Sequence, residues 1–71
     1  MTTNTKHNME FRTIGERIKA AREANILTQA GLAYRMDYSV TYVSQIERDQ
    51  YKPSMRAIRA FEKALGCKLT K

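Results

Sequence analysis

The sequence of 71 residues contains only one cysteine and one histidine. Cys67 has no second cysteine for an internal disulfide, and no nearby histidine gives it the spacing of a metal site. A catalytic pair of Cys67 with His7 would require the two ends of the chain to dock together. These scarcities argue against a disulfide-stabilised secreted domain, a metal site and an enzyme, and they favour a reducing compartment.

Long apolar runs are also missing. Residues 1–12 are polar and lack the apolar segment of a signal peptide, and nowhere do about 18 apolar residues follow one another. A chain this short buries only about 60% of the surface that its unfolded form exposes, which leaves no room for a deep cavity. We therefore expect a cytoplasmic protein with no membrane segment, no cofactor and no small-molecule ligand.

Acidic residues are few. Against 7 Asp and Glu stand 13 Lys and Arg, which gives a formal net charge of +6 and a pI near 9.8. Most of this excess lies in residues 48–71. A basic balance favours a polyanionic partner, either nucleic acid or an acidic membrane surface. The membrane alternative requires a basic helix with a free apolar face, whereas we expect the basic helix near the C-terminus to pack that face on the core.

The chain divides into a short arm and one domain. Residues 1–10 show no apolar periodicity, so we expect a flexible N-terminal arm followed by a domain over residues 11–71. From residue 13 onward, the pattern predicts helices over residues 13–24, 28–36, 39–48 and 54–65, with no strand-like alternation. The expected N-caps are Thr13 (with Glu16 in a capping box), Thr28, Ser39 and Ser54, and Gly66 ends the last helix. The fold class is therefore all-α.

Apolar positions on these helices give a candidate core. On the second helix they are Leu32, Ala33 and Met36, and on the last they are Met55, Ile58, Phe61 and Leu65. The tyrosines suggest a platform for stacking single-stranded bases. We favour a structural role, in which Tyr42 faces the core while Tyr34, Tyr38 and Tyr51 cover helix junctions with their hydroxyls in water.

The helix expected over residues 39–48 carries two different faces. At about 100° per residue, Tyr42, Val43 and Ile46 lie together on one side. The opposite side carries short polar groups that end in a cation: Thr41, Ser44, Gln45 and Arg48, with Val40 at the edge. A helix of this kind fits the major groove of B-DNA, where Gln can bond adenine, Val can pack on a thymine methyl, and Ser or Thr can bond several bases. We expect Arg48 to reach a phosphate.

A helix that reads bases needs a second helix to brace it. The short preceding helix meets this need, because the small side chain of Ala33 allows two helices to cross closely. Gln29 and the open amide groups at the start of that helix are placed to hold a phosphate.

The order of these residues resembles the helix-turn-helix of Cro and phage-repressor-type proteins, the XRE family. The motifs that carry the resemblance, within residues 13–66, are Thr28-Gln29, Leu32-Ala33, Ser39, Tyr42-Val43-Ser44-Gln45-Ile46-Glu47-Arg48 and Pro53-Ser54. The resemblance implies a lambda-repressor-like bundle of four or five helices, with a structural ion pair between Arg22 and Glu47. It also implies base reading by Val40, Thr41, Ser44 and Gln45. The phosphate contacts that we expect are Gln29, Arg35, Arg48, Lys52 and Ser54.

Three positions depart from the family pattern. Asp37 stands where the family usually has a glycine in a left-handed conformation, which Asp tolerates less well. Gly31 replaces the usual acidic residue of a capping box. Asp49 replaces a second glycine beside an expected backbone contact, where its charge would repel a phosphate.

The dimer surface is the least specified part. Many family members add a fifth helix for dimerisation, and this sequence has five residues beyond Gly66. We expect a dimer surface formed by Leu65, Leu69 and Phe11, or a short ribbon formed by the two chain ends.

Two functions follow from these features. The first is a sequence-specific regulator of transcription, a dimeric repressor that reads a pseudo-palindromic operator in double-stranded DNA. The alternative is an antitoxin or adaptor whose main task is to bind a partner protein, such as a toxin, with DNA binding serving autoregulation.

Overall fold

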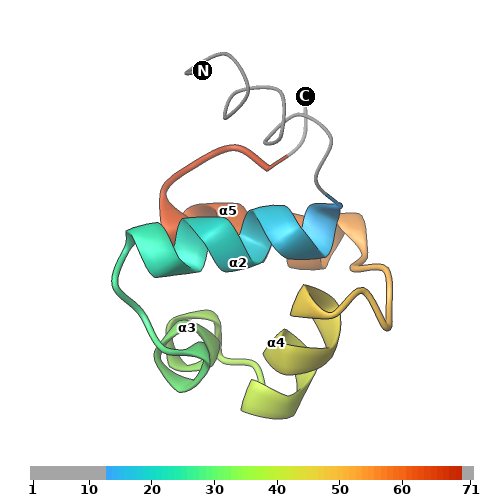
Figure 1. The fold of residues 1–71 in the computed structure, drawn as a ribbon, viewed down its shortest axis with the longest axis horizontal. Coiled ribbons are helices and arrows are strands. Elements are labelled where there is room, and N and C mark those ends of the chain that lie inside the picture. Colours follow the sequence, from blue (N-terminus) through green and yellow to red (C-terminus); the bar gives the residue numbers. More distant parts are fainter. Residues whose placement is uncertain (1–12, 70–71) are drawn as a thin grey trace, which may run out of the picture.

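The computed structural model describes residues 13–69, which form four helices and no strand. The helices are α2 (Ile14–Ala24), α3 (Gln29–Met36), α4 (Val40–Glu47) and α5 (Met55–Leu65). Helices α2 and α5 lie together above α3 and α4, which form the lower half in this view (Figure 1). The predicted all-α fold and its helices are confirmed. The expected arm over residues 1–10, and Phe11, lie outside the described residues.

The N-cap residue, just before each helix, carries a hydroxyl, as predicted. A side-chain oxygen accepts a hydrogen bond from an amide of the first turn, which satisfies a group that the helix itself leaves unbonded. Thr13 and Glu16 form both halves of the capping box. The other three caps accept at 2.9 to 3.1 Å: Thr28 from the amide of Gly31, Ser39 from that of Tyr42, and Ser54 from that of Ala57.

Each helix is followed by a residue in the left-handed conformation. These residues are Ile26, Asp37, Asp49 and Gly66, with φ between 56° and 70°. After α2, the amide of Leu27 bonds the carbonyl of Arg22, and the amide of Ile26 bonds that of Glu23. This is the bond pattern of a Schellman motif, which normally ends on glycine. The left-handed turn expected at Asp37 is confirmed.

Ile26 offers a test of this backbone conformation. A β-branched residue at φ 56° is strained by about 1–2 kcal/mol, and its side chain is 92% exposed, so little packing compensates. We expect Ile26→Gly to raise the free energy of unfolding by about 1 kcal/mol, even though glycine loses more entropy on folding. Thermal unfolding would show a midpoint several degrees higher. Ala24→Gly, in the last turn of α2, is the control and should be destabilising.

The core lies between all four helices and excludes some residues that we expected there. Five large side chains are fully buried: Ile18, Leu32, Val43, Ile46 and Phe61. Met55 was expected to face inward, but it is 56% exposed, because it lies in the first turn of α5, where Ala57 takes the buried position.

Within residues 13–69 no helix is long and apolar enough to cross a membrane.

Two further expectations about apolar surfaces were wrong. Leu65 and Leu69 are each only 4% exposed, so these side chains pack in their own core and are not free to form a dimer surface. Tyr34 and Tyr51 do not cover helix junctions, since they are 88% and 58% exposed. Tyr38, which was also expected to cover a junction, is partly buried and packs against the core.

Candidate nucleic-acid interface

The inner face of α4 is anchored in the core. Val43 and Ile46 are fully buried, and the ring centroid of Tyr42 lies 5.0 Å from that of Tyr38 and 6.3 Å from that of Phe61. Burial raises the pKa of the Tyr42 phenol above its ordinary value, with a smaller contribution from Tyr38, so the ring stays neutral at neutral pH. The helix therefore has a fixed orientation relative to the other three.

The outer face of α4 carries the polar stripe that the sequence predicted. Thr41 and Arg48 are exposed, Val40 is 45% exposed, and Ser44 and Gln45 are half-buried. The division of α4 into an inner and an outer face is thus confirmed. Side chains of this size and polarity match the edges of base pairs in a major groove.

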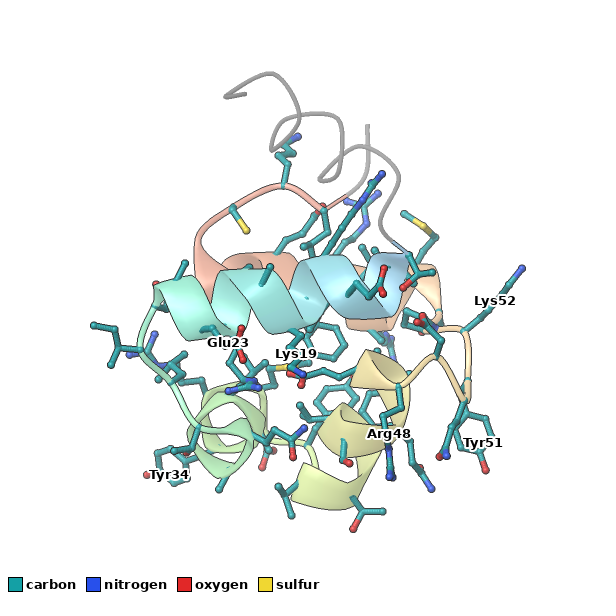
Figure 2. All side chains as sticks on the ribbon, in the orientation of Figure 1. Lys19, Glu23, Tyr34, Arg48, Tyr51 and Lys52 are labelled. Atoms are coloured by element: carbon teal, nitrogen blue, oxygen red, sulfur yellow. The ribbon has the colours of Figure 1, made fainter. Side chains whose placement is uncertain are left out.

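The loop after α4 adds an aromatic residue that we had not predicted for the site. Tyr51 and Arg48 point to the same side of the molecule, beside α4, while Lys52 extends outward from the loop (Figure 2). Tyrosine hydroxyls are common donors to phosphate oxygens. The signal in the sequence was the position of Tyr51 next to Lys52 and three residues after Arg48, in a segment with no apolar periodicity.

A buried ion pair holds the end of α4 to the end of α2. Arg22 donates to both carboxylate oxygens of Glu47, from Nε at 2.7 Å and from Nη2 at 3.2 Å. Its Nη1 also donates to the carbonyl of Leu27 at 2.7 Å. The hydrogen bond to Glu47 raises the pKa of the Arg22 guanidinium, although burial lowers it. The ion pair that the resemblance implied is present.

Three of the expected phosphate contacts have partners inside the protein. Gln29 donates from Nε2 to Glu47 at 3.0 Å, which links the start of α3 to the end of α4. Arg35 lies near the carbonyl of Ala64 in α5, at 3.4 Å, and Ser54 caps α5. Gln29 keeps a second amide hydrogen, and Arg35 and Ser54 remain exposed. The structure brings Arg48 and Lys52 together in one segment, whereas Arg35 lies against another helix.

Several acidic side chains bind groups of the protein itself, although most acidic residues, like the basic ones, stay exposed. Their partners are backbone amides, one hydroxyl, one side-chain amide and one guanidinium, and the bound carboxylates are those of Glu16, Glu47, Asp49 and Glu62. No acidic residue stands in the first turn of α3, α4 or α5. Exposed cations lie on several elements: Lys19, Arg35, Arg48, Lys52, Arg56, Arg59, Lys63 and Lys68. Such a distribution suits a polyanion.

The carboxylate of Asp49 has partners within the protein that the sequence did not indicate. It is bound at the N-terminus of α2, where it accepts hydrogen bonds from the hydroxyl of Thr13 at 2.6 Å and from the amide of Gly15 at 3.1 Å. The positive end of a helix and two donors stabilise it there, although the residue stays exposed. Among residues 13–69, no three His, Cys, Asp or Glu side chains are placed to hold a metal ion.

Comparisons with known proteins agree with this geometry. Residues 18–71 match the family model described as Helix-turn-helix. The chain is 43% identical over 58 residues to a protein named immunity repressor protein, from Bacillus phage phi105. This stretch is 82% of the present chain and 40% of the relative, so the chain spans less than half of that protein's length. No solved structure shows a significant match. The match over three quarters of the chain, together with the α3–α4 arrangement, shows that this protein belongs to the helix-turn-helix family.

Proposed function

We propose that this chain is a repressor of transcription that binds a specific sequence in double-stranded DNA through the outer face of α4. The observation that carries the proposal is the polar stripe on α4, whose side chains are exposed or half-buried, while Val43 and Ile46 on the opposite face are fully buried. The similarity to an immunity repressor of a phage supports the same reading. In this proposal, α4 enters the major groove and α3 braces it against the backbone.

Each residue of the site has a stated role in the proposal. Gln45 bonds an adenine through its amide, Val40 packs on a thymine methyl, and Thr41 and Ser44 bond neighbouring base edges. The contacts to phosphate come from Gln29, Arg35, Arg48, Lys52 and Ser54, with Tyr51 added from its position beside Arg48. Phosphate contacts set the register, while the α4 side chains supply the preference for sequence.

We also propose that the repressor acts as a two-fold dimer. Two copies would place their α4 helices in successive turns of the major groove, about 34 Å apart, and would read an approximately palindromic operator. Because Leu65 and Leu69 are buried in each subunit, the contact between subunits must use other residues.

The test is a selection from random duplex DNA. Purified protein is mixed with the duplex library at about 150 mM salt, where non-specific phosphate binding is weak, and the retained DNA is sequenced. Enrichment of a pseudo-palindrome is the expected result. Retained DNA that matches the input, or no retained DNA, would contradict the proposal and favour the antitoxin or adaptor function instead.

Gln45→Ala tests the base-reading role directly. We expect this variant to lose about 1 to 3 kcal/mol of discrimination at one base position in each half-site, because a bidentate contact to a base is removed. Binding to a panel of single-base variants of the selected duplex measures it. Lys52→Ala is the matched control: it should weaken binding equally on all sequences and reduce the salt dependence. An equal loss on every duplex for Gln45→Ala would refute its role.

A further inference from the structure

The loop that follows α4 is held at its first residues by contacts to a distant part of the chain. Asp49 has φ 61°, and its amide bonds the carbonyl of Ile46 while the amide of Gln50 bonds that of Gln45. These bonds belong to the end of α4. The Asp49 carboxylate instead accepts hydrogen bonds from Thr13, 36 residues earlier in the sequence, and from Gly15, 34 residues earlier. We call this set of three residues, Thr13, Gly15 and Asp49, the clasp.

The donors of the clasp are positioned by the first turn of α2. The hydroxyl oxygen of Thr13 already accepts from the amide of Glu16 at 3.1 Å, so its hydrogen is free to point at the Asp49 oxygen 2.6 Å away. Gly15 is buried, and a Cβ on it would lie 2.6 Å from Oδ1 of Asp49. The close approach of the carboxylate therefore depends on a glycine at this position. Charge-assisted hydrogen bonds at a helix N-terminus are among the stronger ones in proteins.

We propose that Asp49 is a positioning residue for DNA binding, acting through the clasp. The clasp fixes the start of the loop that carries Lys52 and Tyr51 and directly follows Arg48, so it sets where these side chains meet the phosphate backbone. This inference rests on the proposed function. It also reverses the expected sign for Asp49: its carboxylate strengthens DNA binding, although a negative charge beside phosphates would ordinarily weaken it.

Asp49→Gly tests whether the carboxylate strengthens or weakens DNA binding. Glycine adopts φ 61° without strain, so the path of the backbone is retained while the carboxylate is removed. We expect roughly tenfold weaker binding to the selected duplex, and a salt dependence whose slope is shallower by about 0.9 for each phosphate that the variant no longer neutralises. Equal or tighter binding by Asp49→Gly would show that the carboxylate only repels DNA, and it would overturn the proposal.

Glu16→Ala is the matched control. It also removes one negative charge near the N-terminus of α2 and one half of the capping box, but it leaves both bonds to Asp49 in place. Its affinity and salt slope should stay within about twofold of the unmodified protein. A loss equal to that of Asp49→Gly would trace the effect to the first turn of α2, since removing a negative charge does not weaken binding to DNA, and it would contradict a role for the clasp.

The Thr13 end of the clasp gives an independent check. Thr13→Ala removes one of the two bonds to the carboxylate, so it should weaken DNA binding by no more than Asp49→Gly does, and the double variant should be no weaker than Asp49→Gly alone. Thr13→Ser keeps the hydroxyl and should restore binding. Additive losses in the double variant would mean that the two residues act separately, which the proposal forbids.

Hydrogen exchange distinguishes failure of the clasp from failure of the proposed function. Without any DNA, Asp49→Gly should speed exchange at the amides of Gly15 and Gln50 several-fold relative to Glu16→Ala, because Gly15 has lost its acceptor and the start of the loop has lost its anchor. Unchanged exchange would overturn the clasp whatever the DNA result. Faster exchange in a protein that selects no DNA would leave the clasp intact and refute the proposed function alone.

Discussion

Replacing Glu47 with alanine is expected to lower the free energy of unfolding by about 3–5 kcal/mol, the range for removing one partner of a buried ion pair. The Glu47 side chain is only 2% exposed and that of Arg22 only 11%, so water cannot replace the missing carboxylate. Gln29 would lose its acceptor as well. A domain of this length has a total stability of roughly 4–10 kcal/mol, so the variant should lie close to its unfolding threshold.

A second carboxylate beside the same guanidinium provides the control. Glu23 lies 4.0 Å from Nη2 of Arg22, but its side chain is 59% exposed. Glu23→Ala should therefore change stability by less than about 1 kcal/mol. Urea unfolding at low temperature measures the free energy of unfolding of both variants. Arg22→Lys should lower it by less than Glu47→Ala does, because lysine keeps the positive charge but cannot donate to both carboxylate oxygens as arginine does. Equal losses of unfolding free energy in Glu23→Ala and Glu47→Ala would show that burial does not determine how much the Arg22–Glu47 ion pair stabilises the protein.

Both the starts and the ends of the helices could be predicted from the sequence to within one residue, whereas the backbone conformation that follows α2 and α4 could not. Thr28, Ser39 and Ser54 have hydroxyls that bond the backbone locally, so their role depends on neighbours a few positions away. A residue in the left-handed conformation follows each helix, and only at Gly66 does the residue type itself favour this conformation. At Ile26 and Asp49 the chain adopts this conformation without glycine, because tertiary contacts and the Schellman bonds impose it.

The faces of α4 were predictable for a similar reason. A helical period sorts Val43 and Ile46 from Thr41 by sequence alone. The direction of long side chains at the edges of the site was not predictable, because it depends on atoms brought in from other helices. Asp49 is bound by the first turn of α2, and Arg35 reaches a carbonyl of α5. Residues of one type can therefore extend into solvent or bind their own protein with no difference in local sequence.

Gly15→Ala should be nearly as damaging as the loss of Glu47, although it adds only one methyl group. The new Cβ would overlap the carbonyl oxygen of Ile46 in α4 and lie 2.6 Å from Oδ1 of Asp49. One of these contacts is backbone, so α2 and α4 must move apart. Overpacking of this kind destabilises proteins by about 1–3 kcal/mol and occasionally more. Because a rotamer change cannot relieve it, we expect about 3 kcal/mol, beyond what alanine gains in helix propensity.

The same substitution at Gly31 shows whether the effect depends on place. A Cβ there would lie 3.2 Å from the Thr28 hydroxyl and 3.5 Å from a methyl of Leu27, and both are ends of side chains. Alanine favours the helix by about 1 kcal/mol relative to glycine, so Gly31→Ala should stay within about 1 kcal/mol of the unmodified protein. Calorimetric unfolding of both variants measures the difference. A Gly15→Ala protein as stable as Gly31→Ala would mean that α2 and α4 do not approach as closely as described, and the anchoring of α4 on α2 would have to be abandoned.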